Sequence, residues 1–249
     1  MKRGSASKGQ PHRLLPLGEQ GLVVELGDTI DPEVNAWVHR LAAVVRTEAL
    51  AGVTELVPTY RSLLIIFDPL CITRIELTER ITRLAAPVES AALPGAASRV
   101  VRVPVCYGGE FGPDLEFVAR HAGLSIDEVI ALHAAREYPV YLLGFTPGFP
   151  YLGGLDPLLA TPRLDSPRAR IPAGSVAIGG VQTGIYPVES PGGWRLVGRT
   201  PLRLFDPRRP APFLLAPGDG LRFVPIADAA FDAIAAEVLA GRRAPEVEG

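Results

Sequence analysis

The N-terminal part of the chain alternates between strand-like and helix-like hydrophobic patterns. The apolar run Leu22–Leu26 predicts a strand, and Asp31 followed by Pro32 supplies the N-cap and the first position of a helix. That helix has one apolar stripe, at Val34, Trp37, Val38, Leu41, Val44 and Val45. Two strand-like runs and a second helix follow, at Val53–Val57, Ser62–Phe67 and Thr73–Leu84. This order of elements predicts a small α/β sandwich domain over residues 14–86.

A segment without hydrophobic periodicity follows this region. Residues 87–98 are small, include Pro and Gly and are almost uncharged, which indicates a linker. Beyond it, Val100–Cys106 predicts a strand. Two short helices come next, the first ended by Gly123 and the second begun by a capping box of Ser125 and Glu128.

The pattern then changes to short apolar runs separated by Gly and Pro. Runs of strand length lie at Val140–Leu143, Ser175–Ile178 and Leu202–Phe205. A final helix is predicted over Asp228–Leu239, and the tail from Arg242 is expected to be frayed. Short strands joined by tight turns are typical of a barrel or a sandwich, so we predict a second, β-rich domain over residues 99–240. The fold class expected for the whole chain is α+β.

Composition and charge exclude several classes of partner. The chain has 249 residues and a formal charge of −2, which gives no electrostatic reason to expect nucleic acid or an anionic membrane. No apolar run approaches the ~20 residues that span a bilayer. The two cysteines, Cys71 and Cys106, are far apart in the sequence, which argues against a disulfide framework. We therefore expect a cytoplasmic protein.

Most catalytic machinery of common enzymes is absent from the sequence. The only lysines are Lys2 and Lys8, so a phosphate-binding P-loop and Schiff-base chemistry are excluded. The four histidines have no metal-ligand spacing and two cysteines cannot build a structural zinc site, so we expect no metal site. These exclusions disfavour an autonomous hydrolase, ATPase or dehydrogenase and favour one part of a larger assembly.

Five motifs carry a resemblance to a known family. They are Gly-Phe-Thr-Pro-Gly-Phe-Pro-Tyr-Leu-Gly-Gly-Leu at 144–155, Pro-Ala-Gly-Ser-Val-Ala-Ile at 172–178, Gln-Thr-Gly-Ile-Tyr-Pro at 182–187, Ser-Pro-Gly-Gly-Trp at 190–194 and Gly-Arg-Thr-Pro at 198–201. With these motifs the chain resembles, over roughly residues 14–225, the family called KipI, allophanate hydrolase subunit 1 or the B subunit of 5-oxoprolinase. The resemblance implies an N-terminal α/β domain and a C-terminal cyclophilin-like β-barrel.

The resemblance also implies an activity and partners. It implies the B subunit of a 5-oxoprolinase that couples ATP hydrolysis to opening 5-oxo-L-proline to L-glutamate. This subunit would be inactive without the enzyme's A subunit and its C subunit, which is similar to allophanate hydrolase subunit 2. ATP would then be bound by the complex rather than by a P-loop of this chain. Two alternatives stay open: a regulatory protein that inhibits a sensor histidine kinase, and a component of an enzyme for another amide or urea-like substrate such as allophanate.

The polar residues of these motifs supply candidates for chemistry. A lactam is a poor electrophile, so its ATP-activated form must be oriented and shielded from water. Arg168, Arg170 and Arg199 are candidates to bind carboxylate or phosphoryl oxygens, because a guanidinium binds them bidentately. Candidates for a catalytic role are Arg168, His133 and Glu189. The alternatives are a surface ion pair for an arginine, a structural carboxylate for Glu189 and a satisfied core histidine for His133.

Amide and aromatic side chains complete the candidate set. Gln182 and Thr183 could recognise an amide through a paired donor and acceptor, and Tyr186 could form a pocket wall. A partner interface is predicted at the apolar–aromatic cluster of Phe145, Phe149, Tyr151 and Trp194. Ordinary core packing is the alternative for these rings.

Overall fold

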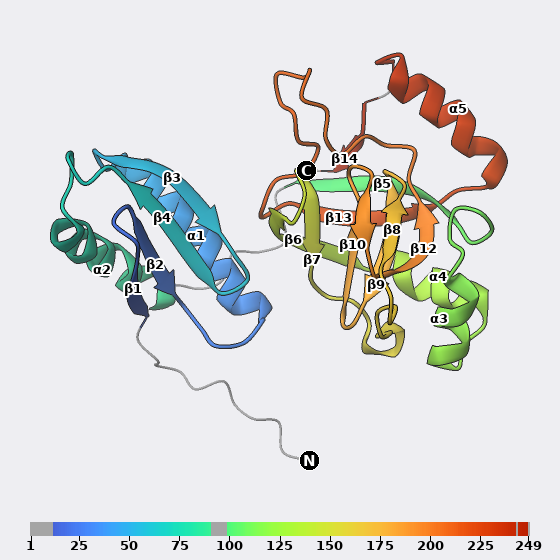
Figure 1. Ribbon diagram of the computed structural model, residues 1–249, viewed down its shortest axis with the longest axis horizontal. Coiled ribbons are helices and arrows are strands. Elements are labelled where there is room, and N and C mark those ends of the chain that lie inside the picture. The colour runs from blue at the N-terminus through green and yellow to red at the C-terminus, as the bar shows by residue number, and fades with distance from the viewer. Residues whose placement is uncertain (1–11, 91–98, 243, 249) are drawn as a thin grey trace. The chain divides into compact units, whose positions relative to one another are not determined.

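The computed structural model describes residues 12–90, 99–242 and 244–248 (Figure 1). The chain divides into two compact units, residues 1–95 and 96–249, each with its own hydrophobic core. Together they give the α+β class that the sequence predicts. Within the described ranges, no helix combines the length and the apolar character needed to cross a membrane.

The N-terminal unit is an antiparallel sheet covered by two helices. Its strands are β1 (Arg13–Leu17), β2 (Gly21–Glu25), β3 (Val53–Pro58) and β4 (Ser62–Phe67), in the spatial order β1-β2-β4-β3. The helices are α1 (Pro32–Glu48) and α2 (Arg74–Ser90). Leu63, Ile65 and Phe67 alternate along β4, share one face, and pack with α1 and α2 in one core. The predicted α/β sandwich is confirmed.

Two local predictions in this unit differ from the structure. Strand β1 was not predicted, because Pro16 and exposed leucines hide the alternation of this edge strand. Helix α2 continues past Pro87 to Ser90, so the start of the predicted linker is helical, and residues 91–98 lie outside the described residues. A proline usually ends a helix because it lacks the N–H donor, which explains the early end in the prediction.

The second unit is a closed barrel of seven strands within the described residues. These strands are β5 (Val100–Tyr107), β6 (Glu137–Gly144), β7 (Phe149–Leu152), β9 (Ser175–Gly179), β10 (Gln182–Ile185), β12 (Arg195–Arg199) and β13 (Gly220–Pro225). They follow the order β12-β9-β10-β7-β6-β13-β5, and β5 pairs back onto β12. Strands β13 and β5 run parallel, and the other neighbours are antiparallel. The predicted β-barrel is confirmed.

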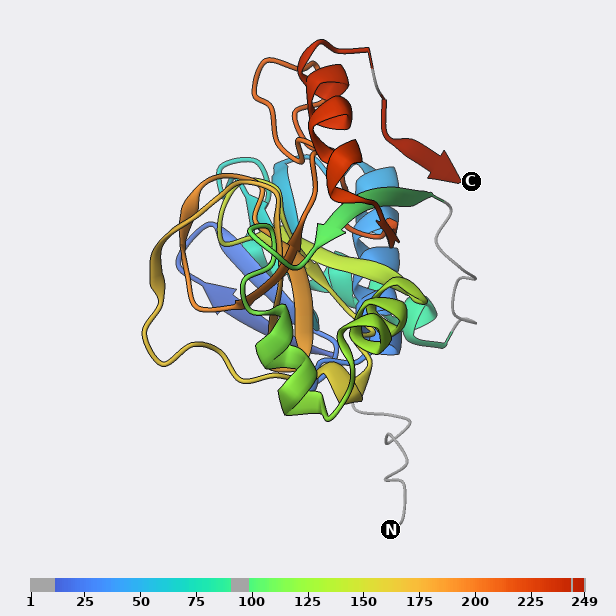
Figure 2. The same cartoon turned by 90° about the vertical axis from the view of Figure 1, so that its right-hand side faces the viewer.

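Helices and a small second sheet surround the barrel. Helices α3 (Leu115–Ala122) and α4 (Ile126–Ala134) lie together at one end, and α5 (Asp228–Leu239) lies at the other (Figure 1, Figure 2). The two-stranded sheet consists of β8 (Arg168–Ile171) and β11 (Ser190–Gly192), and a 3₁₀ turn, η1, spans Pro157–Leu159. Ser125 and Glu128 form the predicted capping box of α4.

Two predictions about the barrel unit are wrong. Leu202–Phe205 is a loop rather than a strand, because Leu202 and Leu204 pack into the barrel core without a continuous ladder partner. The tail from Arg242 was expected to be frayed, yet β14 (Glu246–Glu248) pairs with β5. Its glutamates form ion pairs with Arg102, a contact between distant residues that no local pattern indicates.

Candidate functional site on the barrel

Arg168, the first arginine candidate, is held by the carboxylate of Asp114, which immediately precedes α3. Its Nη1 and Nη2 donate to Oδ2 and Oδ1 of Asp114 over 2.9 and 3.0 Å, a bidentate pair. Asp114 is buried and also accepts the backbone N–H of Leu196 at 2.7 Å. Asp114 therefore connects β8 and β12 to the start of α3.

The other two arginine candidates have different partners. Arg170 donates from Nε and Nη2 to both carboxylate oxygens of Glu189, at 3.0 and 2.9 Å, on the surface of the small sheet. The hydrogen bond from Arg170 lowers the pKa of the Glu189 carboxyl below its ordinary value. The charges of the two candidate residues Arg170 and Glu189 thus neutralise each other. Arg199 donates from Nε to the Ala173 carbonyl at 3.1 Å.

His133 belongs to a chain of hydrogen bonds inside the barrel. Its Nδ1 lies 2.7 Å from the Tyr107 hydroxyl and its Nε2 lies 2.8 Å from Thr183 Oγ1. The Thr183 hydroxyl donates its single proton to the Ala177 carbonyl at 3.1 Å, so it must accept from Nε2–H. The remaining nitrogen, Nδ1, then accepts from Tyr107. This assigns one neutral tautomer to His133.

Burial keeps that histidine neutral. His133 has no exposed surface, its ring stacks on Phe223 with centroids 4.4 Å apart, and desolvation lowers its pKa to about 3. Burial also raises the pKa of Tyr107, which therefore remains a donor. We interpret His133 as the satisfied core histidine that the sequence left as the alternative to a catalytic base.

The two amide-binding candidates point in opposite directions. Adjacent residues of a strand face opposite sides of the sheet, and Thr183 of β10 faces the barrel interior. Gln182 is partly exposed on the other side. The structure therefore does not bring these two side chains into one pocket.

The predicted aromatic residues do gather on the outer face of the barrel. Phe149 packs edge-to-face on Tyr186 and on Trp194, with centroids 5.2 and 5.6 Å apart, and Tyr151 lies 5.0 Å from Phe149. Ile171 of β8 joins this cluster. Tyr186, Phe149 and Trp194 are buried by the chain itself, so of the predicted interface only Phe145 and Tyr151 retain substantial exposure.

Glycines of the motifs make room for these rings. A Cβ at Gly179 would lie 2.5 Å from Cγ of Trp194, and one at Gly184 would lie 3.0 Å from the Phe149 ring. A Cβ at Gly192 would meet the Tyr186 hydroxyl at 2.3 Å. The glycine-rich motifs are thus explained by close packing of aromatic rings on the sheet.

A basic loop beside this cluster was missed by the sequence analysis. Within residues 203–214, Asp206 accepts from Arg208 over 2.8 and 2.9 Å, and Arg203 and Arg209 lie 3.6 and 4.0 Å away. The sequence does carry a signal for this loop, because it has three arginines within seven residues and several prolines beside them.

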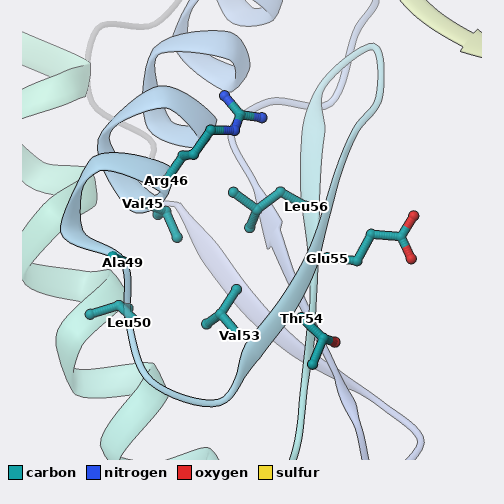
Figure 3. A pocket seen from close by; sticks show the side chains of 8 residues that line it. All are labelled: Val45, Arg46, Ala49, Leu50, Val53, Thr54, Glu55 and Leu56. Atoms are coloured by element: carbon teal, nitrogen blue, oxygen red, sulfur yellow. The ribbon is translucent and has the colours of Figure 1, made fainter. Parts of the chain in front are cut away.

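A hollow in the N-terminal unit holds none of the predicted residues. A groove of about 480 Å³ between the end of α1 and β3 is lined by Val45, Arg46, Ala49, Leu50, Val53, Thr54, Glu55 and Leu56 (Figure 3). The Glu55 carboxylate points away from the hollow (Figure 3). The lining contains no nucleophile paired with a base.

The part of the chain that the structure describes contains no cluster of side chains suited to binding a metal ion. No three His, Cys, Asp or Glu side chains there are grouped so that they could hold an ion. Cys71 and Cys106 are both free thiols.

Comparisons with known proteins agree with the motifs. The sequence model of the carboxyltransferase domain, subdomain C and D, matches residues 12–215. The 5-oxoprolinase B subunit of Bacillus subtilis is 42% identical, over 87% of this chain and 94% of the relative. The 5-oxoprolinase B subunit of Escherichia coli O157:H7 is 45% identical, over 87% of this chain and 97% of the relative.

A solved structure extends the comparison. The crystal structure of TTHA0988 matches 84% of this chain with a TM-score of 0.73 and 41% identity, and the chain covers 40% of that longer protein. Motifs, barrel architecture and relatives agree. The chain therefore belongs to the family of 5-oxoprolinase B subunits, and its residues 12–215 match the carboxyltransferase domain, subdomain C and D.

Proposed function

We propose that this chain is the B subunit of an ATP-dependent 5-oxoprolinase, which opens 5-oxo-L-proline to L-glutamate together with the A and C subunits. The observation that carries the proposal is 42–45% identity, over most of both chains, to proteins of that name. The motifs left open a kinase inhibitor and a component of an enzyme for an allophanate-like amide. The names of relatives at 37–45% identity favour the oxoprolinase over both.

The chemistry of the chain supports a role that depends on partners. Opening a lactam requires activation of the carbonyl oxygen and a base or an oriented water. This sequence has lysines only at Lys2 and Lys8 and no P-loop, so other subunits would bind ATP. His133, the candidate base, uses both ring nitrogens inside the barrel. A cytoplasmic location fits the two unpaired cysteines.

Arg168 remains the candidate from this chain for contact with the reacting group. Its side chain is 31% exposed, and each Nη atom carries a second hydrogen beyond the one that Asp114 accepts. It can therefore meet developing negative charge while staying oriented by Asp114. Arg170, Arg199, Gln182 and Tyr186 remain candidates for substrate contacts in the assembled enzyme.

Reconstitution tests this function. The chain alone, each pair of subunits and all three subunits are incubated with ATP and 5-oxoproline, and glutamate is measured. Glutamate should form only with all three subunits, and no ATP hydrolysis should occur with this chain alone. ATP-dependent glutamate formation by the isolated chain, or none with the complete set, contradicts the proposal.

A further inference from the structure

Phe145 combines exposure with a backbone conformation that a bulky residue rarely adopts. It is 62% exposed and has φ +62°, at the centre of a turn closed by the Thr146 N–H and the Gly144 carbonyl at 2.7 Å. Ala49, the other non-glycine residue with positive φ among the described residues, ends helix α1, where this conformation is common. Phe145 has no such explanation. Strain of this kind persists mainly where function requires it.

The same turn carries a second unfavourable feature. Within the described residues, Oγ1 of Thr146 is buried without a hydrogen-bond partner. A buried hydroxyl without a partner costs free energy, so its presence at a strained turn requires an explanation.

The ring of Phe145 is fixed by the buried cluster below it. It packs edge-to-face on Phe149 and Tyr186, with centroids 5.6 and 6.5 Å apart. Both of these rings are buried. Phe145 is therefore an aromatic side chain held outward, which loses little conformational freedom on binding.

The far end of this turn packs on the basic loop. A Cβ atom added at Gly148 would lie 3.3 Å from Cβ of Phe205 and 3.3 Å from Cδ1 of Phe213. Phe205 and Phe213 stack with centroids 5.2 Å apart, and Phe213 is 44% exposed. The exposed rings of Phe145 and Phe213 thus belong to two adjoining loops.

Backbone hydrogen bonds make the basic loop a defined structure. The Leu214 N–H donates to the Leu204 carbonyl at 2.8 Å and the Asp206 N–H to the Pro212 carbonyl at 2.9 Å. The orange loop after β12 projects from the barrel in both views (Figure 1, Figure 2). Prolines at 207, 210 and 212 restrict it further.

Charge identifies the kind of partner. Arg203, Arg208 and Arg209 surround one carboxylate, Asp206, which leaves an excess of positive charge on the loop. Arg208 is committed to Asp206 by two short hydrogen bonds. Arg203 and Arg209 are farther away and retain donors for an external carboxylate.

We propose that Phe145, Phe205, Phe213, Arg203 and Arg209, called here the Phe145–Phe213 surface, dock another protein subunit whose apolar centre is rimmed by carboxylates. Aromatic residues and arginine are the side chains that dominate the affinity of protein interfaces. The inference rests on the proposed function, because it takes the partner to be another subunit of the oxoprolinase.

Binding measurements with the A and C subunits, each added to the full chain, test the docking. Phe145→Gly removes the ring and relieves the strain at φ +62°, so it should weaken binding at least tenfold while the melting temperature falls by no more than about 2 °C. The control is Leu158→Ala, which removes a side chain of similar exposure, 58%, from η1. It should change affinity less than about twofold.

Reversing the charge of two arginines provides a second test of the docking surface. Arg203→Glu with Arg209→Glu should weaken binding at least tenfold at low salt and less at high salt, because screening reduces the repulsion. Arg120→Glu, an exposed arginine of α3, is the matched control. Unchanged affinity in both surface variants overturns the docking surface and leaves the proposed function standing. Failure of the wild-type chain to bind either subunit overturns both.

Discussion

The interior of the barrel and the Phe145–Phe213 surface both contain residue types that are common in active sites, yet they differ in how those residues are satisfied. Inside, Tyr107, His133 and Thr183 form a chain in which each donor has an acceptor. Outside, Phe145 is strained and exposed, and the arginines near Asp206 outnumber the carboxylates.

This difference separates structural from functional residues. A buried polar group with all its partners specifies the fold, since it has no capacity left for a ligand. An exposed group that the fold holds in a costly conformation has unused binding capacity. By this criterion we interpret His133 as a structural residue and propose Phe145 as a recognition residue.

The largest expected effect concerns Arg168. This residue is partly exposed, like the outer surface, but it also has a partner, Asp114, like the residues inside the barrel. Arg168→Lys keeps the charge but loses the bidentate fork to Asp114, and turnover of the reconstituted enzyme should fall by roughly tenfold to a thousandfold. Assembly should survive, as measured by size exclusion. Arg120→Lys is the control for an exposed arginine. Full activity of Arg168→Lys removes this residue from the site.

The next effect tests the packing under Phe145. Gly179→Ala places a methyl group 2.5 Å from Cγ of Trp194 and should lower the free energy of unfolding by about 2 to 3 kcal/mol. Gly180→Ala has open space and only backbone strain at φ +64°, so it should cost about 1 kcal/mol. Denaturant unfolding of both variants gives the comparison. Equal losses would mean that the ring does not limit residue 179.

The pH dependence of the free energy of unfolding, an effect of similar size, tests the hydrogen-bonded chain inside the barrel. The pKa of His133 is lowered to about 3 in the folded protein, while the unfolded chain has the ordinary value near 6.5. Below pH 6.5 the unfolded state binds a proton that the native state does not, so stability falls as pH falls. The loss from this residue between pH 6.5 and 5 is about 2 kcal/mol.

The matched variant for this effect is His133→Gln. It should be less stable than the wild type at pH 7, because it loses the bonds to Tyr107 and Thr183, but it should lack this part of the pH dependence. Denaturant unfolding at pH 7 and pH 5 measures the difference. Identical pH dependence in both proteins would mean that His133 titrates normally in the fold.

The smallest effect concerns the exposed ion pair. Glu189→Gln removes the partner of Arg170 on the protein surface, where solvent screens the interaction. Its melting temperature should equal that of the wild type within error, in contrast to the buried changes above. A clear decrease would assign Glu189 a structural role that its exposure does not suggest.

Local signals made much of the fold predictable. Asp31 caps α1 and Ser125 pairs with Glu128 at α4, since these contacts involve residues two or three positions apart. The alternation of Leu202 and Leu204 resembled a strand, but barrel packing determines that segment. No local pattern reveals that Arg168 pairs with Asp114, 54 residues away, or that Phe145 has positive φ. The aromatic motif was recognisable, whereas its division into buried and exposed rings required the fold.

The most direct test of the account is the rate of glutamate formation as increasing amounts of this chain are added to fixed amounts of the A and C subunits. The wild-type chain should give a saturable rise from zero. Phe145→Gly should reach the same plateau at a concentration at least tenfold higher, because it weakens docking and leaves the chemistry intact. A lower plateau with unchanged half-saturation would contradict the docking role of Phe145, and no rise with the wild-type chain would contradict its assignment to this enzyme.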